Sequence, residues 1–213
     1  MKPVAVPDER PSRRSDGERT HAAILETAMR LASIEGLGSL TIGRLARELD
    51  ISKSGVFAHF RSKQRLQHET IEAATEVFER EVLSPGMAAP EGLGRVESLC
   101  ESYLSYIERG VFPGGCFFAQ LLAEFDAPSG PIHDQVVADQ RGWLDLLEGE
   151  IETAKRQGQL DPGTDARQVA FELSAAIEMA NYYATLNRDP SITDRGRTAV
   201  KTTLAAAAPP DPG

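Results

Sequence analysis

Apolar side chains recur at three- and four-residue intervals along almost the whole chain, which is the spacing of one buried helix face. The clearest series cover residues 24–32, 42–49, 93–107, 132–151 and 169–184. No convincing alternation of apolar and polar residues, as in a half-buried strand, interrupts them. The pattern therefore predicts an all-α fold of about nine helices.

Turn and capping residues divide this pattern near the start of the chain. Residues 1–14 contain three prolines and no periodicity, so we expect them to form a flexible arm. Ser15 and Glu18 have the spacing of a capping box, which predicts that the first helix begins there. Gly36 and Gly38 should end that helix.

Two short helices should follow. Thr41 suits the N-cap of the first, and Asp50 tolerates the left-handed geometry of a tight turn after it. The second is expected over residues 52–60. The apolar side chains that it should help to bury are Ile51, Val56 and Phe60. Two helices joined by so short a turn suit a helix-turn-helix motif.

A helix-turn-helix domain is thus predicted for residues 15–66, and a larger helical domain for residues 67–207. A long helix over about residues 63–83 should connect them and stop at Pro85 and Gly86. The later helices are expected over residues 91–109, 115–124, 131–158, 165–186 and 192–207. Residues 208–213 are rich in proline and are expected to form a flexible tail.

The composition is ordinary for a soluble globular protein, with 41% hydrophobic and 26% charged residues. No stretch reaches the roughly 18 apolar residues of a membrane span, and the start lacks a signal-peptide pattern. We therefore expect a cytoplasmic protein that has no membrane partner. In that compartment Cys100 and Cys116 should be reduced thiols and not a disulfide.

The charge is unevenly distributed along the chain. The net charge is −9, but residues 1–68 hold twelve Lys and Arg against eight Asp and Glu. Residues 69–213 hold eleven against twenty-four. The basic front indicates an anionic partner such as nucleic acid, although charge fluctuations of a few units are common in any chain.

The helix over residues 52–60 has the properties of one that reads the DNA major groove. The residues outside its buried stripe are Lys53, Ser54, Phe57 and Ala58. Gly55 removes bulk, and His59 near the helix end can bond a phosphate. Lys63 stands at the N-terminus of the next helix, where anions are favoured. A solvated basic face on a structural helix is the simpler alternative.

The stretch LTIGRLARELDISKSGVFAHFRSKQRL, residues 40–66, resembles the N-terminal DNA-binding domain of the TetR family of bacterial transcriptional repressors. The resemblance extends over residues 24–66. It implies a homodimer that binds a palindromic operator in double-stranded DNA, and a C-terminal domain that binds a small-molecule effector. The stretches PGGCFF and DAPSGP resemble one TetR subgroup but indicate no particular ligand.

The resemblance assigns roles by position. Thr41 matches the residue whose hydroxyl caps the second helix and touches a phosphate, and Lys53 and Ser54 match the start of the recognition helix. His59 matches a phosphate-binding histidine, and Lys63 matches the lysine that opens the fourth helix.

The sequence also departs from the family pattern. Phe57 stands where Tyr is commoner, so it lacks a phenol oxygen and suits a thymine methyl group. Ser54 and Gly55 reverse the commoner order. Arg44 occupies the capping-box position three residues after Thr41, where an acid is common, and is placed to face a phosphate instead.

A ligand site in the larger domain is predicted from its aromatic residues, for which packing in the core is the alternative. The candidates are Tyr103, Cys116, Phe117, Trp143 and Tyr182. Cys116 is either a redox sensor or a small buried filler, and the filler is favoured because no basic residue flanks it. His21, His68 and His133 lack the spacing of metal ligands, so we expect no metal, cofactor or catalytic residue.

The predicted dimer surface consists of small and apolar residues, which pack within one subunit in the alternative interpretation. These residues are Ala175, Ala176, Ala180, Val200 and Leu204. The effector should favour a conformation whose recognition helices no longer match half-sites about one helical turn (~34–36 Å) apart.

Three alternatives remain open from the sequence. The basic arm, with Arg10, Arg13 and Arg14, either reaches a minor groove or stays disordered. The larger domain could be an all-α enzyme, although no phosphate loop, nucleophile elbow or run of metal ligands occurs. The protein could also bind DNA without responding to a ligand.

Overall fold

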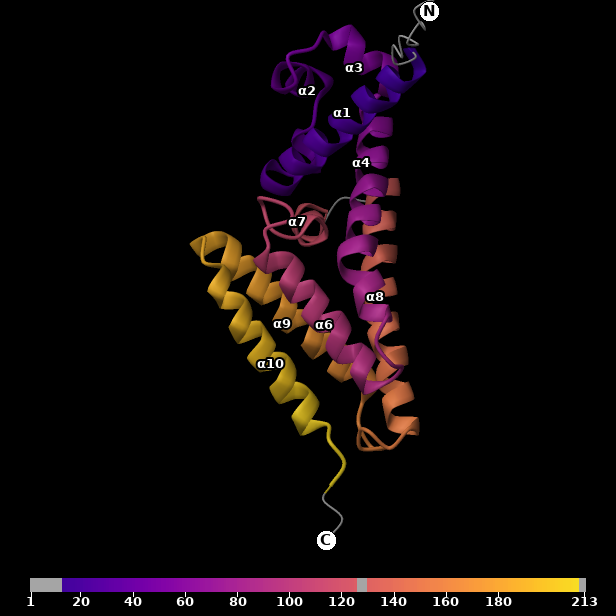
Figure 1. Cartoon of the computed structure of the whole chain (residues 1–213), viewed down its shortest axis with the longest axis vertical. Coiled ribbons are helices and arrows are strands. Elements are labelled where there is room, and N and C mark those ends of the chain that lie inside the picture. The colour runs from indigo at the N-terminus through magenta and orange to yellow at the C-terminus, as the bar shows by residue number, and fades with distance from the viewer. Residues whose placement is uncertain (1–12, 126–129, 211–213) are drawn as a thin grey trace, which may run out of the picture.

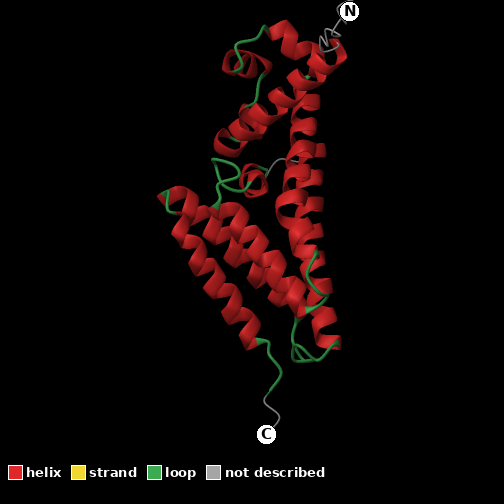
Figure 2. Cartoon of the chain, in the orientation of Figure 1, coloured by secondary structure: helices red, strands yellow, loops and turns green. Residues whose placement is uncertain are grey.

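In a computed structural model, residues 13–125 and 130–210 are described, and every regular element within them is a helix (Figure 2). The prediction of an all-α fold is confirmed. The elements of the front part are α1 (Arg13–Glu35), the 3₁₀ turn η1 (Leu37–Ser39), α2 (Ile42–Glu48), α3 (Lys53–Phe60) and α4 (Lys63–Phe78). The π-helical turn η2 (Glu79–Leu83) and the short α5 (Ser84–Met87) follow.

The rest of the chain adds five longer helices and one 3₁₀ turn. These are α6 (Leu93–Glu108), α7 (Phe117–Glu124), α8 (Pro131–Arg156), α9 (Ala166–Asn187), η3 (Pro190–Ile192) and α10 (Thr193–Ala206). In Figure 1, α1, α2 and α3 form one end of an elongated molecule, and α6, α9 and α10 form the other. The α4 and α8 helices run along its length, and α7 lies between the two ends.

One continuous core joins the two ends. In the front part, Ile24 of α1, Leu45 of α2 and Phe60 of α3 are fully buried, and Ile71 of α4 continues the same apolar face towards the larger domain. Helix α4 contributes buried residues, among them Leu66 and Ile71, to this core along its length.

The first helix begins earlier than the capping pattern predicts. Helix α1 starts at Arg13, so Ser15 and Glu18 lie inside it and not at its N-terminus. Arg is a good helix former, and two of them precede Ser15, so the helix extends through the local signal. Residues 1–12 of the expected arm, Arg10 included, lie outside the described residues.

Pro85 does not stop the connecting helix, contrary to expectation. The chain keeps helical geometry through η2 and α5 as far as Met87. Proline lacks an N–H and its ring crowds the carbonyl of the preceding turn. The wider π-helical turn immediately before Pro85 gives the ring space without ending the helix. Gly86 then allows α6 to approach, because a Cβ there would lie 2.9 Å from the Leu99 Cα.

Candidate functional sites

Helix α3 presents one face to solvent and buries the other. Its N-cap is Ser52, whose hydroxyl accepts a hydrogen bond from the Gly55 N–H (3.0 Å). Val56 and Phe60 are fully buried. Lys53, Ser54, Phe57 and Ala58 are exposed, and 53% of Phe57 is accessible. Four of the residues predicted to contact DNA are thus exposed on α3.

Capping residues fix the turns on either side of α3. The Thr41 hydroxyl accepts from the Arg44 N–H (3.0 Å), as expected of the N-cap of α2. Asp50 has a φ of 52° and Arg61 a φ of 60°, so each ends its helix in the left-handed region. Ser62 then caps α4. The helix-turn-helix geometry is therefore encoded locally.

The basic side chains around α3 fall into two groups. Arg47, Lys53 and Arg61 are exposed and have no carboxylate partner in the described part of the chain. Arg44, by contrast, pairs with Glu35 (2.9 Å) and approaches Glu48 (3.9 Å). A phosphate would have to compete with these carboxylates for Arg44.

Two further predicted contacts are held by neighbours. Lys63 Nζ donates to the Gly38 carbonyl (2.5 Å), which ties α4 to η1. His59 is half-buried, and its ring centroid lies 5.6 Å from that of His21. His21 in turn bonds Glu69 (2.8 Å). These side chains border the α3 surface, although Lys63 is not a free cation.

A cavity of about 280 Å³ lies in the larger domain, between α4, α6, α7, α8 and α9. Tyr103 and Trp143, both predicted for the ligand site, line it. Phe118 lines it too, and so does Phe78, which no sequence pattern indicated. The cavity wall is mainly apolar, as in most small-molecule sites. Trp143 Nε1 is buried and bonds no described residue, so it is available to a ligand.

Two carboxylates also line this cavity. Glu178 of α9 is half-buried, and burial raises the pKa of its carboxyl group despite a hydrogen bond from Ser174 (3.3 Å). Asp139 of α8 is more exposed, and partial burial raises its pKa as well. Neither was selected from the sequence.

The other three ligand candidates lie elsewhere. Cys116 and Tyr182 line an open groove between α7 and α9. Phe117 is fully buried in the core and lines neither space. Ala119, Leu122 and Glu178 border both the cavity and the groove, so the two spaces share a wall. The five candidates therefore do not form a single site.

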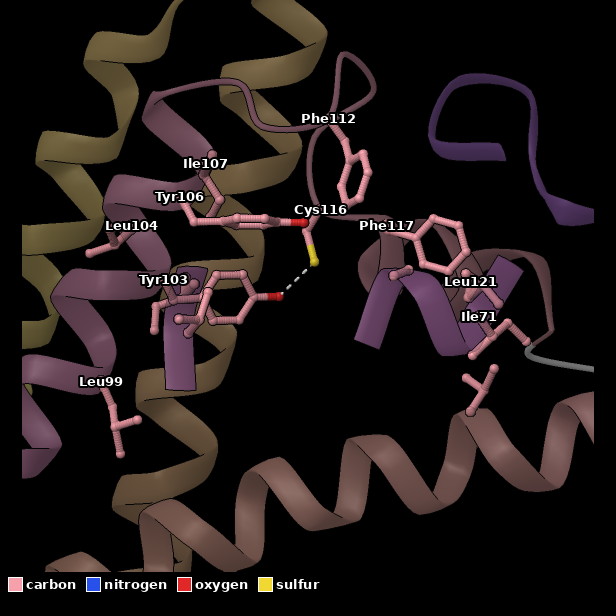
Figure 3. Close-up of a cluster of buried hydrophobic side chains, with 14 of the residues drawn as sticks. Ile71, Leu99, Tyr103, Leu104, Tyr106, Ile107, Phe112, Cys116, Phe117 and Leu121 are labelled. Carbon is pink, nitrogen blue, oxygen red and sulfur yellow. Dashed lines mark hydrogen bonds between the residues drawn. The ribbon is translucent and has the colours of Figure 1, made fainter. Parts of the chain in front are cut away.

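Cys116 is fully buried where α6 and α7 meet. Figure 3 shows the Tyr103 hydroxyl directed at the Cys116 sulfur, to which it donates over 3.0 Å. The Cys116 N–H donates to the Asn181 side chain (2.8 Å). Burial raises the pKa of the Cys116 thiol, which keeps it protonated and favours the role of a structural filler.

Most of the predicted dimer surface is buried inside the subunit. Ala180, Val200 and Leu204 pack between α9, α10 and α6. Gly196 of α10 makes this packing close, because a Cβ there would lie 2.9 Å from the Ala180 Cβ. Only Ala175 and Ala176 keep partial exposure. Helix α9 exposes a different apolar set, the α9 face, which consists of Phe171, Met179, Tyr182, Tyr183 and Leu186.

A carboxylate that no sequence pattern indicated joins α7 to the front part of the molecule. Glu124, the last residue of α7, accepts from the backbone N–H groups of Leu37 and Gly38 (2.6 Å each). Gly36 leaves space for it, since a Cβ there would lie 2.8 Å from a Glu124 oxygen. We call this contact the Glu124 clamp. Nearby, Gly114 before α7 donates to the Ser33 hydroxyl of α1 (3.2 Å).

The described ranges hold neither a metal-binding cluster nor a membrane-spanning helix. No cluster of three His, Cys, Asp or Glu side chains is arranged to hold a metal ion. None of the described helices combines the length and hydropathy needed to cross a bilayer.

Two family models match the chain. Residues 24–70 match the model of bacterial regulatory proteins of the tetR family. Residues 92–200 match the model of the tetracyclin repressor-like C-terminal domain. No curated protein sequence matches the chain.

Solved structures of similar fold cover almost the whole chain. A TetR transcriptional regulator from Chloroflexus aurantiacus has a TM-score of 0.82 at 20% identity, over 91% of this chain and 98% of that one. A putative transcriptional regulator from Saccharomonospora viridis in complex with choline has a TM-score of 0.73 at 23% identity, over 90% and 98%. AibR in complex with isovaleryl coenzyme A and operator DNA has a TM-score of 0.65 at 21% identity, over 89% and 98%.

Proposed function

Because the chain belongs to the TetR family of bacterial regulatory proteins, we propose that it is a homodimeric repressor that releases its operator when a small molecule fills the cavity. It is a DNA-binding transcriptional regulator. The observation that carries the proposal is the outward face of α3, which combines Lys53, a cation with no carboxylate partner among the described residues, with a fully buried opposite side. An effector is supported by the small molecules present in two of the similar structures.

On this proposal α3 enters the DNA major groove. Lys53 and Ser54, at the N-terminus of α3, supply donors for base edges and phosphates. Phe57 suits a thymine methyl group, and Gly55 and Ala58 permit close approach. The proposed phosphate contacts are Thr41, His59 and Lys63, with Arg44 contributing only where phosphate displaces its carboxylate partners.

The α9 face is the surface that supports a homodimer. Its exposed large apolar side chains follow one side of a single helix, and such patches mark interaction surfaces. A two-fold dimer through this face would use the same patch on both subunits. Its symmetry would direct two copies of α3 to the two halves of a palindromic operator.

Replacing Tyr182 with Glu is expected to convert the dimer into a monomer, because a charge would be buried at the centre of the α9 face. Light scattering at a fixed protein concentration measures the change in mass. Met87→Glu is the control, since Met87 is an exposed apolar residue of α5, outside the α9 face. A wild-type protein that is monomeric at micromolar concentration would contradict the proposed dimer.

Two contacts support coupling between the cavity and α3. Helix α4 carries Phe78 at the cavity and is anchored to α3 and η1 at its other end. Helix α7 carries Phe118 at the cavity and the Glu124 clamp at its end. An effector that favours the arrangement in which α3 no longer fits the operator must weaken operator binding, and the operator must weaken effector binding by the same factor.

The function is tested by fluorescence anisotropy with labelled DNA taken from upstream of the protein's own coding sequence. A specific repressor should stay bound at salt concentrations that release random DNA, because base contacts add to the phosphate attraction. Equal salt sensitivity on both DNAs would exclude sequence-specific regulation through that site. A ligand-independent DNA-binding protein would show no metabolite-induced shift in thermal unfolding.

A further inference from the structure

The carboxylates of the cavity differ from other partly buried carboxylates of the chain. Glu69, Glu81 and Glu150 each accept a hydrogen bond from an arginine, at distances between 2.6 and 3.0 Å. Glu178 and Asp139, in contrast, have no cationic partner among the described residues. A half-buried carboxylate without a counter-ion is costly, so the cavity has an unmet preference for positive charge.

The charged residues around the cavity have one sign only. Among the described residues that line it, none is Lys, Arg or His, and the titratable groups are Tyr103, Asp139 and Glu178. An anionic ligand would therefore meet two carboxylates and no compensating cation. A neutral ligand would leave the carboxylates as they are, whereas a cation would gain attraction in a partly desolvated site.

The rings in the cavity wall suit a cation as well. Phe78 lies nearly perpendicular to Tyr103 (85°), Phe118 (76°) and Trp143 (83°), with ring centroids 5.2 to 6.1 Å apart. All four of these residues line the cavity. The electron-rich face of an aromatic ring attracts a cation within about 6 Å of its centroid.

We propose that the effector is an organic cation with an apolar body, whose ammonium group is held between Glu178 and the faces of these rings. That the cation acts as an effector rests on the proposed function, whereas its binding is inferred from the cavity alone. Burial raises the pKa of Glu178, because no cation among the described residues offsets the cost of burying its charge. Asp139, nearer solvent, attracts the same cation as it enters. The volume of about 280 Å³ limits the ligand to a small molecule.

The test compares three probes of similar size by calorimetry: benzyltrimethylammonium, its neutral isostere 2,2-dimethylpropylbenzene, and phenylacetate. The cation is expected to bind at least tenfold more tightly than the neutral isostere, and phenylacetate should bind most weakly. Equal affinity of cation and isostere, tighter binding of phenylacetate, or no binding of the cation would overturn the proposal.

Variants locate the binding and separate it from stability. Glu178→Gln should lose at least tenfold in affinity for the cation and keep its affinity for the neutral isostere. It should also unfold at a higher temperature than the wild type at pH 7 without ligand, because the buried charge is gone, which shows that the variant is folded. Asp139→Asn should have a smaller effect, and Asp145→Asn, on the same helix but away from the cavity, should have none. Unchanged cation affinity in Glu178→Gln would show that the cation does not bind at Glu178.

A parallel operator titration keeps this inference distinct from the proposed function. If the cation binds through Glu178 but leaves operator affinity unchanged, the cation site stands and the repressor mechanism fails. If an uncharged or anionic probe enters the cavity and releases the operator, the repressor mechanism stands and the cationic effector fails.

Discussion

Replacing Lys53 with Glu is expected to weaken operator binding about a hundredfold or more, which corresponds to about 2.8 kcal/mol. The side chain lies exposed at the first position of α3 and pairs with no described carboxylate. The substitution removes a cation and places an anion against phosphates, and a dimer carries the change twice. Fluorescence anisotropy at constant salt measures the loss.

Arg156→Glu is the matched control, because it makes the same change of charge at the far end of α8. It should leave operator affinity within about twofold of the wild type. Lys53→Ala adds a second measurement, since losing one phosphate contact should lower the slope of affinity against salt concentration by about one per subunit. A Lys53→Glu protein that binds the operator like the wild type would remove α3 from the DNA interface.

Replacing Glu124 with Ala is expected to loosen the front part of the molecule from the larger domain. The Glu124 clamp consists of two charge-assisted hydrogen bonds from backbone N–H groups, and one of the donors belongs to the buried Leu37. Bonds to charged acceptors contribute about 1.5–3 kcal/mol each, and an unpaired buried donor adds a cost. Because the bond from Gly38 is exposed to solvent and contributes less, we expect a total loss of about 2–4 kcal/mol in the packing of the front part against the larger domain.

The single tryptophan of the chain makes this measurable by region. Trp143 reports on the larger domain, whereas circular dichroism reports on all helices. In urea the two transitions should coincide for the wild type and separate for Glu124→Ala, with part of the helical signal lost first. Glu124→Gln keeps one acceptor oxygen and should behave in between. Coincident, unshifted transitions in Glu124→Ala would show that the clamp does not hold the ends together.

The helix-turn-helix part could be predicted closely because its signals are local. Thr41 caps α2, Asp50 takes the left-handed conformation, and Val56 and Phe60 are buried, each as the sequence indicated. The start of α1 was predicted wrongly for the same reason. A capping pattern is a local preference, and good helix formers upstream override it.

The cavity and the clamp could not be predicted in the same way. Glu124 and Leu37 are 87 residues apart, and no local pattern records that they meet. Periodicity shows which side of a helix is buried but not which buried sides leave a space between them. Tyr103 lines the cavity and Phe117 fills the core, although both appeared as apolar positions of similar helices. The same ambiguity placed Ala180 on a dimer surface when it packs against α10.

The wall that separates the cavity from the groove on the α9 face is one layer of side chains, including Glu178 and Leu122. In the proposed homodimer the second subunit would rest against the outer side of the residues that the ligand touches from within. Ligand affinity would then vary with protein concentration, because dilution dissociates the dimer and removes the second subunit from the outer side of these side chains. A cell that makes few copies of this protein would respond to the compound at a different threshold from one that makes many.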